Sequence, residues 1–205
     1  MSDDHRVSSI EALERLYPAP LAPSVAKELP ALNAHYRRLL AASPFLTIAS
    51  VGPEGLDCSP RGDAPGFVAV LDERTLAIPD RRGNNRLDTL RNIVADPRVA
   101  LWFAIPGLNE TLRVNGRAHL STAPELLARF DVDGRRPTTA IVVAIDRVYF
   151  QCARALKRSR LWDPATRVDP RTLPSAGTLI RPAIAEFDAE RYDAELQARQ
   201  DRTLW

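Results

Sequence analysis

Short apolar runs separated by turn residues fill the middle of the chain and predict β-strands. The runs cover residues 45–51, 56–61, 66–71, 75–78, 98–105, 110–120 and 140–145, the last continuing into 148–150. Residues 98–105 and 140–145 are almost continuously apolar, which predicts strands buried on both faces. Residues 110–120 alternate between apolar and polar side chains, which is typical of a strand with one buried face. Many short strands at close spacing predict a small antiparallel barrel rather than a parallel doubly wound sheet.

Helical patterns flank these strands and interrupt them at one point. Ser8 and Glu11 form a predicted capping box that opens a helix to residue 17, where prolines end it. Further helices are expected at 32–42, 122–130, 153–162 and 187–204. Another is expected after the strand 75–78, ending at residue 95. The chain therefore divides into an N-terminal helical arm (1–44), a barrel (45–165), and an irregular segment with a C-terminal helix (166–205). Pro60 is expected to end strand pairing or to mark a bulge.

A polar cluster lies where the strand 75–78 ends and the next helix begins. It reads Ile78-Pro79-Asp80-Arg81-Arg82-Gly83-Asn84-Asn85-Arg86. Asn84 or Asn85 is expected to cap the helix, which would place Arg86 in its first turn. An arginine there opposes the helix dipole, so the cluster indicates a site for a phosphate dianion on Arg81, Arg82 and Arg86. The alternative is a solvated loop with a turn at Gly83.

A second polar stretch, Ser59-Pro60-Arg61-Gly62-Asp63, ends the strand 56–61. Residues that break a strand ladder leave backbone N–H groups free, and such a break lets a flat ligand approach the backbone. The alternative is an ordinary strand exit with a surface pair between Arg61 and Asp63.

Composition excludes several classes of function. The net charge of +2 is too slight to indicate a nucleic-acid or membrane partner. Lysine occurs only twice, so arginine is the usual basic residue of this chain. A single arginine therefore does not indicate a binding site. Cys58 and Cys152 suit a reducing cytoplasm, and Cys58 reads as a small buried hydrophobe. The three histidines lack the spacing of metal ligands, so no metal site is expected. No nucleotide-binding fingerprint is present.

The chain resembles the FMN-binding split-barrel proteins related to pyridoxamine 5′-phosphate oxidase, and within them the branch without an assigned substrate. The matching segments are 59–63, 80–88, 96–99 and 110–116. By this resemblance, Arg61 corresponds to a flavin-contacting strand arginine, Ile78-Pro79 to a segment that ends a later strand, and Asn84-Asn85-Arg86 to a Ser-Arg-Lys motif. Thr111 stands where the family has a glutamine that reaches the flavin of the partner subunit. The Arg-x-His substrate motif is missing, so pyridoxamine phosphate oxidation is not expected.

The resemblance implies an antiparallel split β-barrel with flanking helices and an FMN-dependent oxidoreductase of unassigned substrate. FMN would lie at a homodimer interface, with its phosphate on Arg81, Arg82 and residues 84–86 and its ring near residues 59–61. Small molecules, with NADH or NADPH as candidate donors, would be the partners. No catalytic residue is identified, and Lys157, Arg158 and Trp162 are candidates for the far side of the pocket. The alternatives are a non-catalytic flavin carrier or sensor, and the same barrel holding haem or a deazaflavin.

Overall fold

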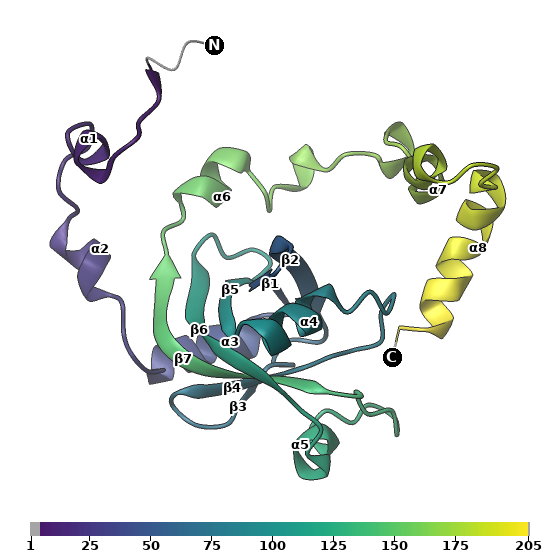
Figure 1. Ribbon diagram of the computed structural model, residues 1–205, viewed down its shortest axis with the longest axis horizontal. Helices are drawn as coiled ribbons and strands as arrows, with labels where there is room; N and C mark the ends of the chain where they lie inside the picture. The colour runs from purple at the N-terminus through teal and green to yellow at the C-terminus, as the bar shows by residue number, and fades with distance from the viewer. Residues whose placement is uncertain (1–4, 205) are drawn as a thin grey trace.

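Seven strands form one antiparallel sheet in the computed structural model, which describes residues 5–204 (Figure 1). Their spatial order is β2-β1-β5-β6-β7-β4-β3, and the sheet curls into a split barrel that is not closed. The bounds are β1 Phe45–Gly52, β2 Gly55–Gly62, β3 Ala69–Val70, β4 Thr75–Pro79, β5 Arg98–Ala104, β6 Thr111–Ser121 and β7 Ala140–Gln151. The predicted fold class is therefore confirmed.

Alternating side chains of the central strands fill the core. Leu46 and Ile48 of β1, Leu101 of β5 and Val114 of β6 are almost fully buried, as the apolar alternation predicts. Helices α3 (Ala34–Ala42) and α4 (Asp88–Ala95) add their own apolar residues to the same core cluster. The core thus joins the curved sheet to two helices, and α3 of the predicted N-terminal arm packs into it.

The prediction of strands buried on both faces is right for residues 140–143 of β7, fails at the exposed Ala144, and is wrong for β5. Ala140 to Val143 are all buried, because a second apolar cluster around Phe130 covers the face that looks away from the main core. In β5, Ala100 and Trp102 remain half-exposed on the outer face of the sheet. Among residues 5–204, no apolar cluster like the one around Phe130 packs on that face.

Gly116 marks the bulge that bends the longest strand pair, β6–β7. The register shifts between Asn115, opposite Arg147, and Gly116, opposite Ile145. A Cβ at Gly116 would lie 2.1 Å from the carbonyl oxygen of Ala144, so only glycine allows the two backbones to approach here.

Pro60 does not end strand pairing, because β2 continues to Gly62 and Pro60 pairs with Thr47. β2 is an edge strand, and a proline that lacks an N–H is tolerated where no strand follows. Helix α1 (Ile10–Glu14) is capped by Ser9 rather than Ser8 and ends before Tyr17. The remaining helices are α2 (Ala22–Ala26), α5 (Pro124–Ala128), α6 (Arg154–Ser159), α7 (Ala176–Ile180) and α8 (Ala189–Arg202). Of these, α2 and α7 were not predicted.

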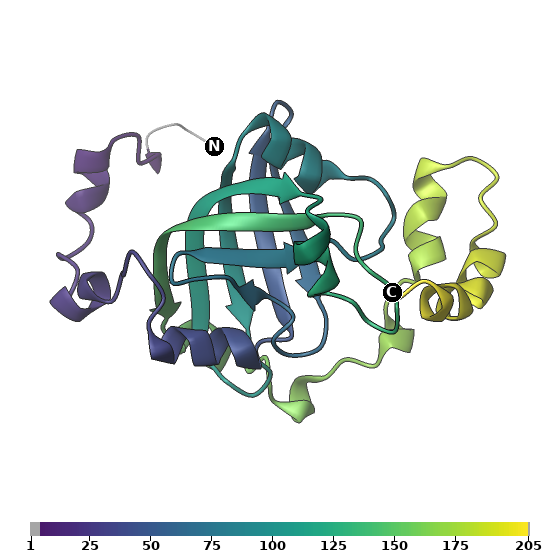
Figure 2. The same cartoon turned by 90° about the horizontal axis from the view of Figure 1, so that it is seen from below.

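The two ends of the chain extend away from the barrel. Figure 2 shows the segment with α1 and α2 on one side of the barrel and the pair α7–α8 on the other. None of the helices among residues 5–204 combines the length and the apolar character needed to span a membrane. The expected division into three parts stays a prediction.

Candidate functional site: a cavity between β2, the 79–90 segment and the loop before β7

A cavity of about 930 Å³ opens where β2, the segment from β4 to α4, and the loop before β7 meet. Most of the residues proposed from the sequence line it: Ser59, Pro60, Arg61, Pro79, Arg81, Arg82, Asn84, Asn85 and Arg86. Two proposed residues do not. The Ile78 side chain is fully buried in the core, and Thr111 lies in another part of the sheet. The structure therefore brings the two polar stretches, which residues 64–77 separate in the sequence, onto one cavity wall.

Asp57 organises the β2 side of the wall. Its Oδ2 accepts hydrogen bonds from Ser59 Oγ at 2.9 Å and from Thr89 Oγ1 at 2.9 Å. These bonds tie the edge strand to the first turn of α4, where Thr89 is buried. Because Ser59 donates its proton to Asp57, its oxygen is left to accept a hydrogen bond from a ligand. Asp57 was not singled out from the sequence.

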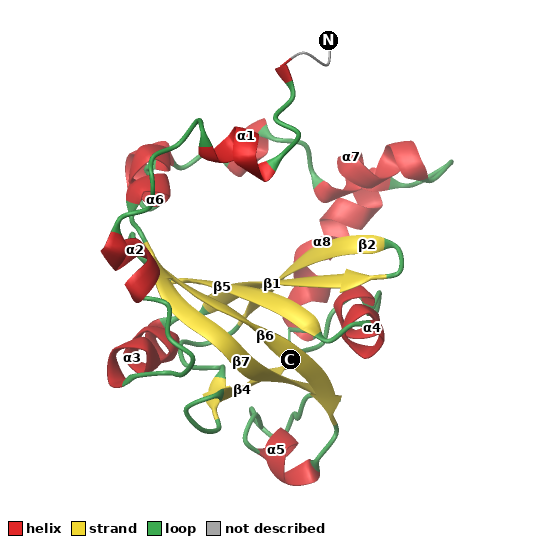
Figure 3. Cartoon of the chain, turned by 60° about the vertical axis from the view of Figure 1, so that its left-hand side comes forward, coloured by secondary structure: helices red, strands yellow, loops and turns green. Residues whose placement is uncertain are grey.

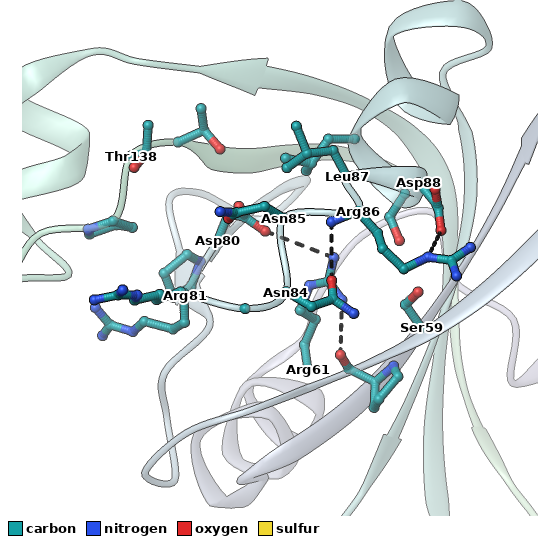
Figure 4. Close-up of a pocket in the computed structure, with 18 of the residues that line it drawn as sticks. Ser59, Arg61, Asp80, Arg81, Asn84, Asn85, Arg86, Leu87, Asp88 and Thr138 are labelled. Carbon is teal, nitrogen blue, oxygen red and sulfur yellow. Dashed lines mark hydrogen bonds and ion pairs between the residues drawn. The ribbon is translucent and has the colours of Figure 1, made fainter. Parts of the chain in front are cut away.

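Arg61 and Asp80 form the half-buried charged pair of the cavity (Figure 4). Arg61 Nη2 lies 3.8 Å from Asp80 Oδ1, and the two side chains are 21% and 20% exposed. Burial raises the pKa of Asp80, and the attraction of Arg61 opposes that rise. Arg61 Nη1 also donates to the carbonyl oxygen of Pro60, but its Nε is buried without a partner. The expected surface pair with Asp63 does not form.

Asp63 pairs instead with Arg81, whose guanidinium group makes its hydrogen bonds mainly to other residues of the protein. Arg81 Nε donates to Asp63 Oδ2 at 2.8 Å, and Nη1 donates to the carbonyl oxygen of Phe130 at 2.7 Å. Asp63 is only 3% exposed in its side chain, so this ion pair is shielded from water. Arg81 thus connects the exit of β2, the end of β4 and the segment after α5, and we assign it mainly to holding the wall in place.

The loop 82–87 has a different geometry from the one expected. Helix α4 begins at Asp88, and Leu87 precedes it in the left-handed conformation, so neither asparagine caps the helix and Arg86 is not in its first turn. The side chain of Asn84 instead accepts from the N–H of Arg86. Asn85 is left-handed as well, with φ of 59°. Asp88 occupies the first turn, where a negative charge suits the dipole.

Open backbone donors remain in this loop. Within residues 5–204, the N–H groups of residues 82 to 85 bond no protein acceptor. Consecutive free N–H groups beside left-handed residues can bind an anion. The side chain of Arg86 turns to Asp88, since its Nε pairs with Asp88 Oδ2 at 2.7 Å, and it is 74% exposed (Figure 4).

The loop before β7 forms the third wall, which the sequence analysis missed. Residues 135–139 line the cavity and bring two arginines to it. Arg136 pairs with Asp131 at 3.0 Å in an exposed position, whereas Thr139 Oγ1 is buried without a partner. The signal was the pair Arg135-Arg136 in a glycine-containing loop directly before a buried strand, but local pattern does not show that this loop folds back to residue 80.

The polar atoms that line the cavity decide whether it fits an anionic, partly aromatic cofactor. Among residues 5–204, Arg61 Nε and Thr139 Oγ1 are the only buried side-chain polar atoms without a partner, and both residues line the cavity. An unsatisfied buried polar group costs about 1–3 kcal/mol, which a bound group can recover by hydrogen bonding. Together with the open N–H groups and the arginines, these atoms fit a phosphate-bearing ligand such as FMN. No cluster of potential metal ligands occurs in the described part of the chain.

Sequence comparison places the chain in a family. The model for pyridoxamine 5′-phosphate oxidase matches residues 32–152, which is more than half of the chain. The chain belongs to this family. The matched residues contain β1 to β7 and all three walls of the cavity. No curated protein matches the sequence.

Solved structures of similar fold have low sequence identity to this chain. HupZ of Group A Streptococcus has a TM-score of 0.49 and 14% identity, over 58% of this chain and 98% of its own. A candidate pyridoxamine 5′-phosphate oxidase from Lactobacillus delbrueckii has a TM-score of 0.48 and 21% identity, over 60% and 98%. An FMN-binding protein from Syntrophomonas wolfei has a TM-score of 0.43 and 12% identity, over 57% and 88%.

Four residues expected to contribute to the site by family resemblance or by position lie outside this cavity. Thr111 is buried, and its Oγ1 accepts a hydrogen bond from Trp102 Nε1 at 2.9 Å. Trp162 donates to the carbonyl oxygen of Leu108, while Lys157 and Arg158 are exposed on α6. Within one chain, therefore, none of the four lines the cavity.

Proposed function

We propose that the protein is an FMN-dependent oxidoreductase of a small-molecule substrate, with the flavin bound at a homodimer interface. The observation that carries the proposal is the pair of unpartnered buried polar atoms, Arg61 Nε and Thr139 Oγ1, both in residues that line one cavity together with a run of open backbone N–H groups. The family membership of the chain supports FMN as the ligand. Bound FMN would supply the redox chemistry, exchanging electrons or a hydride with donor and substrate.

The residues of the chain would divide the work of binding. The N–H groups of residues 82–85 and the guanidinium groups of Arg82 and Arg86 would hold the phosphate. The side chains of Ser59 and Arg61, with the backbone of Pro60 between them, would face the ring, where Arg61 supplies an N–H donor and Ser59 Oγ an acceptor. Asp57 would keep the Ser59 hydroxyl in that orientation, and Arg81 would keep the wall in register through Asp63.

The outer face of the sheet supports the homodimer part of the proposal. Cross-strand register places six uncharged side chains on one face of β2, β1 and β5, here called the outer patch: Thr47, Ala49, Leu56, Cys58, Ala100 and Trp102. Leu56 is 87% exposed and Cys58 is exposed, so Cys58 is not the buried hydrophobe that was expected. Arg113 and Asn115 lie beside the patch on β6 and would form a polar rim.

The outer patch and the cavity share strand β2. Asp57, Ser59 and Arg61 point toward the cavity side, while Leu56 and Cys58 point to the patch, because successive side chains of a strand alternate. A second copy bound on the patch would therefore lie against the strand that lines the flavin site. This arrangement would also cover the half-exposed face of β5.

The experiment is to identify the cofactor that copurifies and to test its reduction. We expect flavin absorption bands in the near-ultraviolet and blue, and release of FMN rather than riboflavin on denaturation. Bleaching by NADH or NADPH and reoxidation by an acceptor would support the enzyme. A flavin that neither nicotinamide reduces would support a carrier or sensor, and a Soret band or a deazaflavin spectrum would replace FMN as the ligand.

A further inference from the structure

The terminal segments 5–28 and 163–204 carry large apolar side chains that do not pack within the chain. Helices α1 and α2 are five residues long each and bury none of their side chains. The exposed fractions are Ile10 64%, Leu16 64%, Tyr17 68%, Leu21 75%, Leu179 68% and Ile184 51%. Isolated helices of this length are not stable in water, so they need a surface to pack on.

The backbone of these segments is nevertheless specified by its own sequence. Ser9 caps α1, Ser175 caps α7 and Asp188 caps α8. The C-terminal pair is built closely, because Asp193 Oδ1 accepts from the N–H of Gly177, where a Cβ would lie 2.4 Å from the carbonyl oxygen of Ala189. Segments that encode caps and a close helix contact are elements of a folded structure rather than solvated linkers.

Their position identifies the surface. Figure 3 shows α1, α6 and α7 on one side of the sheet and α3, α4 and α5 on the other. Since α4 packs on the core face of β1, the segments with α1 and α7 lie on the side of the sheet that carries the outer patch. They extend past the edges of their own barrel instead of covering the patch (Figures 2 and 3).

We propose that the two terminal segments form a clamp that holds a second copy of this chain by its barrel, over the outer patch. This inference rests on the homodimer of the proposed function and assigns to the dimer the segments that secure it. A two-fold dimer brings the uncharged patches of both copies together, and the segments of each copy, which extend past their own barrel, then lie along the other. The patch is uncharged, and the large exposed side chains of the segments named above are apolar, which suits an uncharged protein surface and not a nucleic acid.

The test uses the full chain in two isotopic forms. A photo-crosslinking amino acid replaces Leu179 in light and heavy-nitrogen protein, the two are mixed until subunits exchange, and crosslinked peptides are identified by mass spectrometry. We expect crosslinks from this position to barrel peptides that join one light and one heavy chain. Crosslinks only within one isotopic form, in a sample that light scattering shows to be dimeric, would overturn the clamp and leave the dimer standing. A monomeric full chain would overturn both.

Charged substitutions in the terminal segments test independently whether these segments stabilise the dimer. Ile10→Asp and Leu179→Asp alter exposed positions, so the circular dichroism spectrum should not change, while dimerisation should weaken on the order of tenfold or more. The matched control is Val94→Asp, since Val94 is 75% exposed on α4, on the opposite side of the sheet. Equal dissociation constants for all three variants and the unaltered protein, measured by sedimentation equilibrium, would overturn the clamp.

Discussion

Replacing Arg61 by methionine should weaken FMN binding strongly without lowering the stability of the ligand-free protein. Without ligand, the substitution removes an ion pair with a separation of 3.8 Å, worth about 0–1 kcal/mol in a partly exposed position. It also removes a buried Nε that has no partner, which recovers roughly 1–3 kcal/mol of desolvation cost. The central values of these opposing effects leave a net gain of about 1.5 kcal/mol, so the melting temperature should rise by about 3–6 °C.

If FMN binds in this cavity as proposed, the same substitution would remove a charge-assisted hydrogen bond. Such a bond contributes about 1.5–3 kcal/mol, which corresponds to a dissociation constant raised roughly 10- to 100-fold. The assay is titration of flavin fluorescence with FMN and with riboflavin. If Arg61 contacts the ring, both ligands lose affinity; if it contacts the phosphate, only FMN does.

The control for Arg61→Met is Arg98→Met. Arg98 pairs with Asp96 in an exposed position and lies outside the cavity wall, so its loss should leave both affinities unchanged. Unchanged affinity of Arg61→Met for both ligands would refute the reasoning that its unpartnered nitrogen marks the flavin site. A melting temperature lowered by ten degrees or more would show that Arg61 is structural.

Three further predictions concern the loop, the buried carboxyl and the core. Arg86→Ala should weaken FMN binding about tenfold and leave riboflavin binding unchanged in the same titration, because the arginine must exchange Asp88 for the phosphate; equal effects on both ligands would contradict a phosphate contact. Burial raises the pKa of Asp80, so the stability linked to its protonation is complete below the unfolded pKa and is lost as the pH rises through the folded one. Asp80→Asn should abolish that decline in urea unfolding series taken at rising pH above the ordinary pKa of an aspartate, and an unaltered slope would contradict it. Leu101→Ala, at a side chain 1% exposed in the core, should lower the free energy of unfolding by about 2–5 kcal/mol in urea titrations, and a loss under about 1 kcal/mol would contradict its core position.

Residues along the chain determined much of the fold by themselves. The alternation in β6 correctly predicted that Leu112 and Val114 are buried, because side-chain direction in a strand depends only on local backbone geometry. The continuous apolar run at the start of β7 likewise predicted burial on both faces. The polar stretches 59–63 and 78–86 also indicated most of the cavity wall, since residues that interrupt strands leave donors free for a ligand.

The tertiary structure decided what depends on partners distant in sequence. Helix α4 begins at Asp88 and not at Asn84 or Asn85. At its start, Asp57 of β2 accepts a hydrogen bond from Thr89, and Leu87 adopts the left-handed conformation. Pro60 stays in the ladder only because β2 is an edge, and Arg81 finds Asp63 and the Phe130 carbonyl from other elements. The loop with Thr139 reaches the cavity because β7 pairs with β4. Periodicity reports the face of one element, whereas the partner of a charge or of an unpaired donor is set by how the elements pack.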